Sequence, residues 1–390
     1  MKLRHPKNLI RFKANLKTIH LCDMSASNSN YFPALTGIRA LAAYLVFFHH
    51  FFNPEKVAVG VYLPGFFFGE MHIGVTFFFV LSGFLIHSRY AQKFESGLSG
   101  FKPYFFSRIA RIMPLFLAVT ILTFLVVPFF KLEDPLKWIR LFILNISLLK
   151  GFSDATKFSG VYQSWSLTVE FCFYALAPVL FFLFRNQVKR YLYLSLFFLI
   201  ICFALANFLN GLPVGNLIGD VHFFLGYTFF GRSFEFFAGC FLSSRLNRWK
   251  ILTGSIPVYT MAGSIGILFS LFCLTLLRSG DILGDHHPIG IGINNFLLPV
   301  FIVFFFRGLI LEASFLQQFL SSRIMQLLGK SSYAFYLIHI GIFESLISFI
   351  HLDNRLVSFF LFNLIAIFLY HFVEEPAQIR LQKWYSFRFG

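Results

Sequence analysis

Long runs of apolar residues alternate along the chain with short segments that carry Lys and Arg. A helix needs about 20 apolar residues to cross the roughly 30 Å of hydrocarbon in a bilayer. Ten runs are long enough to do so, and this pattern predicts an all-α, polytopic membrane helix bundle. The predicted spans cover residues 34–53, 72–90, 114–130, 166–184, 191–209, 222–243, 253–277, 291–306, 333–350 and 356–373.

An eleventh apolar stretch, residues 138–149, is short and contains Arg140 and Asn145. Its placement follows from charge, because Lys and Arg gather in the cytoplasmic loops of membrane proteins. With ten spans and both termini in the cytoplasm, the cytoplasmic segments hold 23 Lys and Arg and the external segments hold 8. We therefore expect residues 131–165 to form an external loop with a short interfacial or re-entrant helix.

The composition agrees with a membrane protein. The chain of 390 residues is 57% hydrophobic and 13% charged, whereas a soluble domain is about 25% charged. Its formal charge of +16 is explained by the cytoplasmic Lys and Arg, so no nucleic-acid partner is expected. The five Cys have no paired spacing, which predicts core residues and neither a disulfide framework nor a metal site.

The first 30 residues are basic and polar, and they are predicted to be a cytoplasmic tail, 1–30. They lack the apolar core of a cleavable signal peptide. Four apolar residues recur there at helical spacing, as in a helix that lies on an anionic leaflet. A disordered basic tail, or a natural start at Met24, would explain the same residues.

Ionisable side chains occur inside several predicted spans, where each costs at least about 2.5–3.5 kcal/mol on insertion scales. Arg39 and His50 are 11 residues apart in the first span. At about 100° per residue, both side chains share one helix face, about 16 Å apart along the axis, and His49 is rotated roughly 80° away. That face carries a fixed cation and a histidine suited to acid–base chemistry. A snorkelling Arg39 and a structurally bonded His50 are the alternative.

Arg108 and Arg111 follow the second span at i and i+3, and so share a helix face. Guanidinium groups bind phosphate oxygens in a forked geometry, so the pair suits a phosphorylated ligand. Ordinary cytoplasmic loop charge is the alternative. Within the second span, Ser82 and Gly83 would let another helix or a ligand approach closely.

Three later spans also contain ionisable residues. Glu170 lies near the external end of its span, at a predicted depth similar to that of His50, and we expect it to orient or charge-pair with that ring. Arg232 and Glu235 are i,i+3 neighbours in mid-span, and we expect them to neutralise each other. His339 lies in the middle of the ninth predicted span.

Seven segments follow one another along the chain: FPALTGIRALAAYLVFFHH, FFFVLSGFLI, the Arg-x-x-Arg of Arg108 and Arg111, SWSLTVEFCFYALAP, RSFEFFAG, SYAFYLIH and VEEP. Together, in this order, they resemble the acyltransferase-3 family of integral membrane acyltransferases. The resemblance covers residues 31–376, predicted to be the transmembrane acyltransferase domain, with a cytoplasmic tail at 377–390. It implies ten helices with cytoplasmic termini, in agreement with the charge count.

The resemblance implies transfer of an acyl group, usually acetyl from acetyl-CoA, to a hydroxyl of an extracytoplasmic carbohydrate. The protein would be a multi-pass protein of the bacterial inner membrane, and the acceptor a lipopolysaccharide O-antigen, an exopolysaccharide or another surface or lipid-linked glycan. Arg39, Arg108 and Arg111 would bind the donor. His50, assisted by Glu170, would act as a general base or as an acyl-carrying nucleophile. No metal cofactor is implied, and the chain either acts alone or relies on a separate periplasmic transferase.

Two other classes of protein fit some of these features. A transporter or flippase of a glycan or glycolipid would also place ionisable residues in its bundle, although the paired arginines and the lack of evident inverted repeats favour an enzyme. A sensor or scaffold would use the charged pairs only structurally. Within the enzyme class, the acceptor could also be a secondary-metabolite, periplasmic-glucan or peptidoglycan sugar.

Overall fold

A computed structural model describes residues 31–52, 67–126, 134–184, 187, 189–210, 219–246, 248–249, 256–279, 282–349 and 354–389. Throughout these residues the regular elements are helices, apart from one isolated bridge between Ser279 and Ile282. The predicted all-α fold is therefore confirmed. The predicted tail 1–30 lies outside the described residues.

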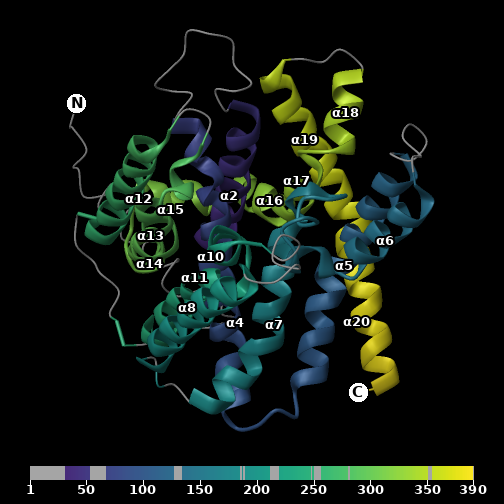
Figure 1. Cartoon of the computed structure of the whole chain (residues 1–390). Coiled ribbons are helices and arrows are strands. Elements are labelled where there is room, and N and C mark those ends of the chain that lie inside the picture. The colour runs from purple at the N-terminus through teal and green to yellow at the C-terminus, as the bar shows by residue number, and fades with distance from the viewer. Residues whose placement is uncertain are drawn as a thin grey trace, which may run out of the picture. The chain divides into compact units, whose positions relative to one another are not determined.

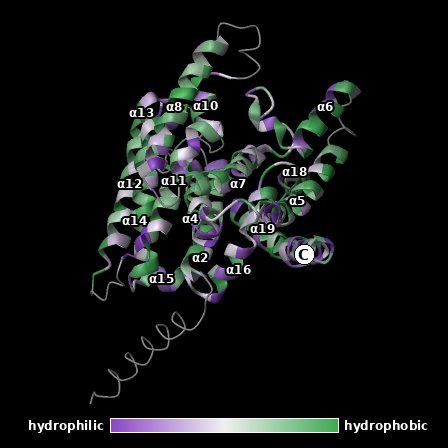
Figure 2. Cartoon of the chain, turned by 90° about the horizontal axis from the view of Figure 1, so that it is seen from below, coloured by the Kyte–Doolittle hydropathy of each residue, from purple (hydrophilic) through white to green (hydrophobic). Residues whose placement is uncertain are grey.

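Seven helical runs of the described chain are long and apolar enough to cross a membrane, and a bent pair makes an eighth. Hydrophobic positions cover most of their ribbons in Figure 2. The bent pair is α17 (Ser332–Ile338) and α18 (Ile342–Phe349), which meet at 69°. The seven runs are Pro33–Phe52, Phe67–Glu95, Phe101–Val126, Tyr162–Phe184, Val258–Leu277, Pro288–Leu311 and Arg355–Phe389.

The sequence pattern predicted ten spans, and seven to eight of them are long and apolar enough to qualify among the described residues. Helices do occupy the two remaining segments: α8 (Lys189–Asn210), then α10 (Val221–Tyr227) and α11 (Phe229–Leu246). The apolar part of α8 is short, Tyr193–Ala206. Charged and small residues lower the mean hydropathy of α11, so its composition alone does not qualify it as a span.

Helix α4 (Gly74–Glu95) is central, because it packs against α2 (Pro33–Phe52), α7 (Trp165–Phe184), α11 and α14 (Leu298–Leu311). Figure 1 shows α12 (Val258–Leu277) and α14 on one side of α2, and α5 (Phe101–Val126) and α20 (Glu375–Phe389) on the other.

The contact between α4 and α11 is a glycine seam, formed by Gly83 of α4 and Gly239 of α11. A Cβ on Gly83 would lie 1.9 Å from the carbonyl oxygen of Phe236, and a Cβ on Gly239 would lie 1.9 Å from that of Val80. The two backbones therefore touch directly, as small residues permit between membrane helices. The approach expected at Gly83 is thus made by α11.

The last predicted span continues well beyond residue 373. Helix α19 (Arg355–Leu369) passes through a π-helical turn, η8 (Tyr370–Glu374), into α20. The segment predicted to be a cytoplasmic tail, 377–390, is therefore helical to Phe389. It packs on α5, where the rings of Phe106 and Tyr385 stack at 4.4 Å.

The predicted external loop contains α6 (Pro135–Ile146), whose 12 residues extend only about 18 Å and cannot cross a bilayer. Beyond α6, buried Lys150 fixes the loop: its Nζ donates to the carbonyl oxygens of Ser159 at 2.5 Å and Val161 at 2.7 Å. Gln163 then donates through Nε2 to the carbonyl oxygens of Tyr336 and Leu337. These bonds return the chain to the bundle at the start of α7.

Candidate active site

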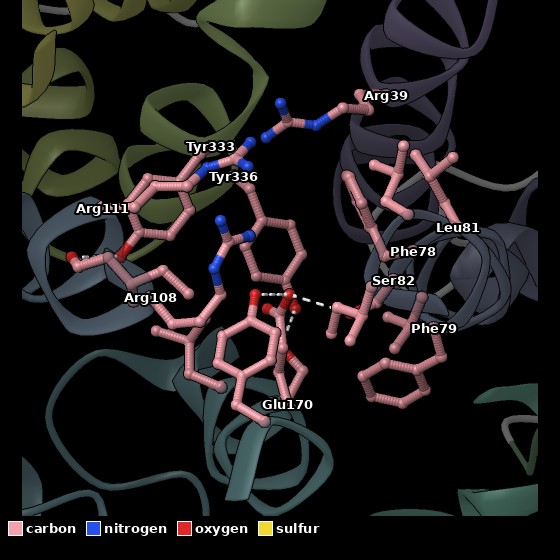
Figure 3. Close-up of a pocket in the computed structure, with 17 residues that line it drawn as sticks. Arg39, Phe78, Phe79, Leu81, Ser82, Arg108, Arg111, Glu170, Tyr333 and Tyr336 are labelled. Atoms are coloured by element: carbon pink, nitrogen blue, oxygen red, sulfur yellow. Dashed lines mark hydrogen bonds between the residues drawn. The ribbon is translucent and has the colours of Figure 1, made fainter. Parts of the chain in front are cut away.

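A cavity with three arginines in its wall lies among α2, α4, α5, α7 and α17 (Figure 3). We call it the arginine cavity. It brings together five residues singled out from the sequence, which are Arg39, Ser82, Arg108, Arg111 and Glu170. The predicted phosphate-binding pair and the cation of the first span therefore share one cavity, although nearly 70 residues separate them.

The arginine cavity is electrostatically positive. In Figure 3 the guanidinium groups of Arg39 and Arg111 approach each other from opposite walls, with Arg108 below them. Two carboxylates oppose the three cations. One is Glu170 in the cavity wall, and the other is Glu374, a buried residue of η8 whose charge interacts with both Arg39 and Arg111. One positive charge remains in excess, which favours an anionic ligand.

Arg108 is held in place mainly by aromatic rings. Its guanidinium lies 5.5 Å from the centre of the Tyr90 ring and 6.0 Å from that of Tyr174, and Nη2 donates to the Tyr90 hydroxyl at 3.3 Å. Its buried Nε has no hydrogen-bond partner among the described residues. An unsatisfied buried donor is costly, so a ligand oxygen at this point would be stabilising.

Glu170 lies in a different place from the one predicted. One of its carboxylate oxygens accepts hydrogen bonds from the hydroxyls of Tyr174 and Ser82, the latter at 3.5 Å. The carboxylate lines the arginine cavity and not the cavity that contains His50. Glu170 is five residues beyond Trp165, which places it about 7.5 Å further along α7 and roughly 140° around the helix. Trp165 is the residue of α7 that lines the other cavity.

A second cavity lies at the opposite end of α2, and we call it the histidine cavity. Its polar wall combines His49 and His50 of α2, His72 of the 3-10 helix η2 (Glu70–Ile73), Arg232 of α11 and Asp285 of the 3-10 helix η6 (Gly284–His286). Its apolar wall is largely aromatic: Phe158, Tyr162, Trp165, Tyr227 and Tyr336.

Both histidines of the tandem reach this cavity, so the helix-face argument does not separate them. Nδ1 of His49 contacts the carbonyl oxygen of Gly69. A carbonyl only accepts, so this nitrogen carries the proton and Nε2 is left as the basic one. The His50 ring lies 5.5 Å from the His339 ring and 5.9 Å, edge-on, from the Tyr162 ring.

His339 ends α17 beside the break before α18. It is completely buried, and its Nδ1 donates to the carbonyl oxygen of Tyr336 at 2.8 Å. Its Nε2 is buried and has no hydrogen-bond partner in the part of the chain that the structure describes. The broken helix thus presents an unprotonated imidazole nitrogen close to the His50 ring.

The two cavities adjoin at Tyr336 and Val75, which line both of them. The Tyr336 hydroxyl is hydrogen-bonded to that of Ser166 at 2.8 Å and donates to the carbonyl oxygen of Gln163 at 3.1 Å. This ring is therefore fixed at the boundary. A ligand that extends from the arginine cavity to the histidine cavity would have to pass this ring.

Arg232 and Glu235 form a buried ion pair at 3.0 Å, the geometry expected from their i,i+3 spacing. Arg232 also donates to Asn295 Oδ1 at 3.0 Å and to Thr76 Oγ1 at 3.1 Å. It therefore joins three helical elements and at the same time forms part of the histidine cavity wall. Asn295 was not predicted, because a lone amide in an apolar run carries no spacing signal.

His72 and Asp285 were also missed by the sequence reasoning. Nε2 of His72 lies 3.2 Å from Glu70 Oε2 and 3.6 Å from Asp285 Oδ2. Burial by itself would raise the pKa of Asp285, but the charges of His72 and His286 outweigh it and lower that pKa below its ordinary value. The signal that could have found them is a cluster of His and carboxylates, in EMH and GDHH, beside predicted spans.

A family model described as an acyltransferase domain matches residues 32–372, which is most of the chain. The chain belongs to the acyltransferase-3 family. The resemblance drawn from the sequence motifs is thereby confirmed, and the arginine and histidine cavities both lie within the matched acyltransferase-3 region. No solved structure matches the chain.

Among curated proteins, this acyltransferase-3 chain is similar to the O-acetyltransferase OatA of Staphylococcus aureus, at 24% identity over 92% of this chain and 59% of the relative. A Bacillus subtilis protein named "Putative peptidoglycan O-acetyltransferase YrhL" is 25% identical over 92% of this chain and 56% of its own length. The chain thus spans less than two thirds of these relatives.

Proposed function

We propose that this acyltransferase-3 protein transfers an acetyl group from cytoplasmic acetyl-CoA to a hydroxyl of an extracytoplasmic carbohydrate. The observation that carries the proposal is the pair of adjoining cavities. One is rich in arginine and the other in histidine, and α2 contributes to both, with Arg39 near its start and His50 near its end.

The arginine cavity supplies groups that suit the donor. CoA carries a diphosphate and a 3′-phosphate, and Arg39, Arg108 and Arg111 can engage such oxygens with charge-assisted hydrogen bonds. Nε of Arg108, which has no hydrogen-bond partner among the described residues, is one available donor. The thin pantetheine arm would then extend past Phe78 and Tyr336, which line this cavity, and carry the thioester toward the histidines.

The histidine cavity supplies groups for the chemistry. As a general base, His50 takes the proton of the acceptor hydroxyl. The hydroxyl oxygen attacks the thioester carbonyl carbon, and the CoA thiolate leaves. As a nucleophile, the ring first accepts the acetyl group from CoA and then passes it to the hydroxyl oxygen. His49 is the alternative ring, because the bond from its Nδ1 to the carbonyl oxygen of Gly69 leaves Nε2 unprotonated and able to accept a proton.

The acceptor end of the site suits a sugar. The rings of Tyr162, Trp165 and Tyr227 offer apolar faces, and Asp285 and Gln163 offer hydroxyl partners in the same wall. A pocket with apolar walls and a few fixed polar groups is typical of small-ligand sites. Acceptors that fit are a surface glycan such as an O-antigen or exopolysaccharide, a lipid-linked sugar, or, as the name of the Bacillus relative states for that protein, peptidoglycan.

We place the protein in the cytoplasmic membrane of a bacterium. It acts either directly on the acceptor or through a separate periplasmic transferase that receives the acetyl group.

The test compares surface glycans by mass spectrometry from cells with and without the gene, together with CoA release by the purified protein. We expect an acetyl difference in one glycan class and CoA release that depends on that glycan. A transporter of a glycan would leave the thioester intact. Identical glycans and no CoA release would therefore remove the proposal.

A further inference from the structure

Five side chains of the metal-ligating type gather around Asp285 at the edge of the histidine cavity. They form two triads that share Asp285, and within each triad the potential ligand atoms lie within 4.8 Å of one another. The inner triad is Glu70, His72 and Asp285, and the outer triad is His222, Asp285 and His286. The proposed acetyl transfer uses neither His222 nor His286.

The inner triad is already satisfied by protein groups. Glu70 accepts from the backbone N–H of Gly284 at 2.9 Å and contacts His72 at 3.2 Å. The guanidinium of Arg278 lies 3.9 Å from the same carboxylate. A cation here would face a guanidinium at short range and would displace existing bonds. This triad is an ion-pair cluster.

The outer triad has the opposite character. The rings of His222 and His286 stack at 3.9 Å between centroids and at 26°, so that a nitrogen of each ring lies within 4.8 Å of an Asp285 oxygen. The two carboxylate oxygens of Asp285 have different surroundings. Oδ2 lies 3.6 Å from His72, whereas Oδ1 is buried and has no hydrogen-bond partner among the described residues. A buried carboxylate oxygen without a donor is costly, and a cation would remove that cost.

We propose that His222, Asp285 and His286 bind a zinc ion, or another late first-row divalent cation, at the edge of the histidine cavity. Two imidazoles and one carboxylate form a ligand set typical of zinc, with a fourth position left for water or substrate. Imidazole disfavours magnesium and calcium, which take oxygen ligands. Ligands about 2 Å from a tetrahedral ion are roughly 3.3 Å apart, so only modest side-chain rotation is needed to close the site.

The surroundings match those of a built metal site. Nε2 of His72 lies 3.6 Å from the second oxygen of Asp285, and a neighbour in this position can orient a carboxylate that binds a metal. His286 is exposed, which provides an entry path. The ion would join the start of α10 to η6. Because Asp285 also lines the histidine cavity, it would do so beside the acceptor end of the site.

The test measures zinc itself, so its outcome does not depend on acetyl transfer. The full-length protein, purified in detergent and stripped with a chelator, is titrated with zinc by calorimetry, and bound metal is counted by mass spectrometry. We expect one zinc per chain and at least a tenfold loss of affinity in His222→Ala and His286→Ala. His371→Ala, which removes a half-exposed histidine from η8, should bind as the unaltered protein does.

Folding is monitored by size-exclusion chromatography, and an aggregated variant is replaced by the corresponding His→Gln. A tenfold excess of magnesium should not compete. The proposal is overturned if the unaltered protein binds no zinc, if all three variants bind equally, or if magnesium displaces the ion.

Discussion

Replacing Arg111 by Gln should weaken acetyl-CoA binding without destabilising the protein. Arg111 is half-buried and faces Arg39 across the arginine cavity (Figure 3), so in the absence of ligand its loss relieves a repulsion between two cations. Glu374 interacts with both arginines, so after the substitution Arg39 still balances its negative charge. Losing one charge-assisted hydrogen bond to phosphate costs about 1.5–3 kcal/mol, which is roughly ten- to a hundredfold in the dissociation constant.

The assay is calorimetric titration of the detergent-purified protein with acetyl-CoA and with its 3′-dephospho form, alongside a thermal melt. Arg89→Gln is the matched control. Arg89 is exposed on the last two turns of α4, and its charge interacts with those of Arg108 and Arg111, but its side chain does not line the cavity. It removes the same charge from the same region.

If Arg111 binds the 3′-phosphate, the substitution should cost little with the dephospho ligand. If it binds the diphosphate, both ligands should weaken equally. Equal affinities in Arg111→Gln and the unaltered protein, or equal losses in Arg111→Gln and Arg89→Gln, would refute direct contact and return Arg111 to the role of a cytoplasmic loop charge.

Three further predictions follow from the contacts described above. His50→Ala should lower glycan acetylation about 10²–10⁴-fold and His49→Ala much less; the reverse order in purified protein would assign the chemistry to His49. Tyr336→Phe removes two hydrogen bonds and should lower the unfolding free energy by about 1–3 kcal/mol, read from chemical denaturation; an unchanged value would contradict the fixed ring. Lys150→Met leaves two carbonyl groups without a donor and should hasten proteolysis of the loop between α6 and α7; equal cleavage rates would show that Lys150 does not hold this loop.

Sequence periodicity predicted contacts and faces within single helices, and much less between helices. The 3.6-residue repeat placed Arg232 beside Glu235, and the arginines of α5 beside each other, because both members of each pair ride on one backbone. Glu170 was misplaced because its contact with Ser82 of α4 depends on how deeply α7 sits against α4, and span limits leave that depth open by several residues.

Hydropathy predicted where the helices lie. α8 and α11 form where apolar runs were found, yet α11 carries buried polar residues that only its neighbours satisfy, such as Arg232 against Asn295 and Thr76. The outer triad was not predicted either, because His222 and Asp285 are 63 residues apart and meet only through packing. The tandem of His49 and His50 shows a limit of the helix-face argument. His49 is rotated about 80° from the face of Arg39, yet both rings line the histidine cavity at the end of α2.

The glycine seam between α4 and α11 restricts how the molecule can move. With the two backbones in contact at Gly83 and Gly239, neither helix can slide or tilt across the other without steric collision. We therefore expect alternating access by rocking α4 and α11 against each other to be disfavoured. If a bulky nucleotide enters the arginine cavity, we expect α5, α7 and the broken α17 to move relative to this seam.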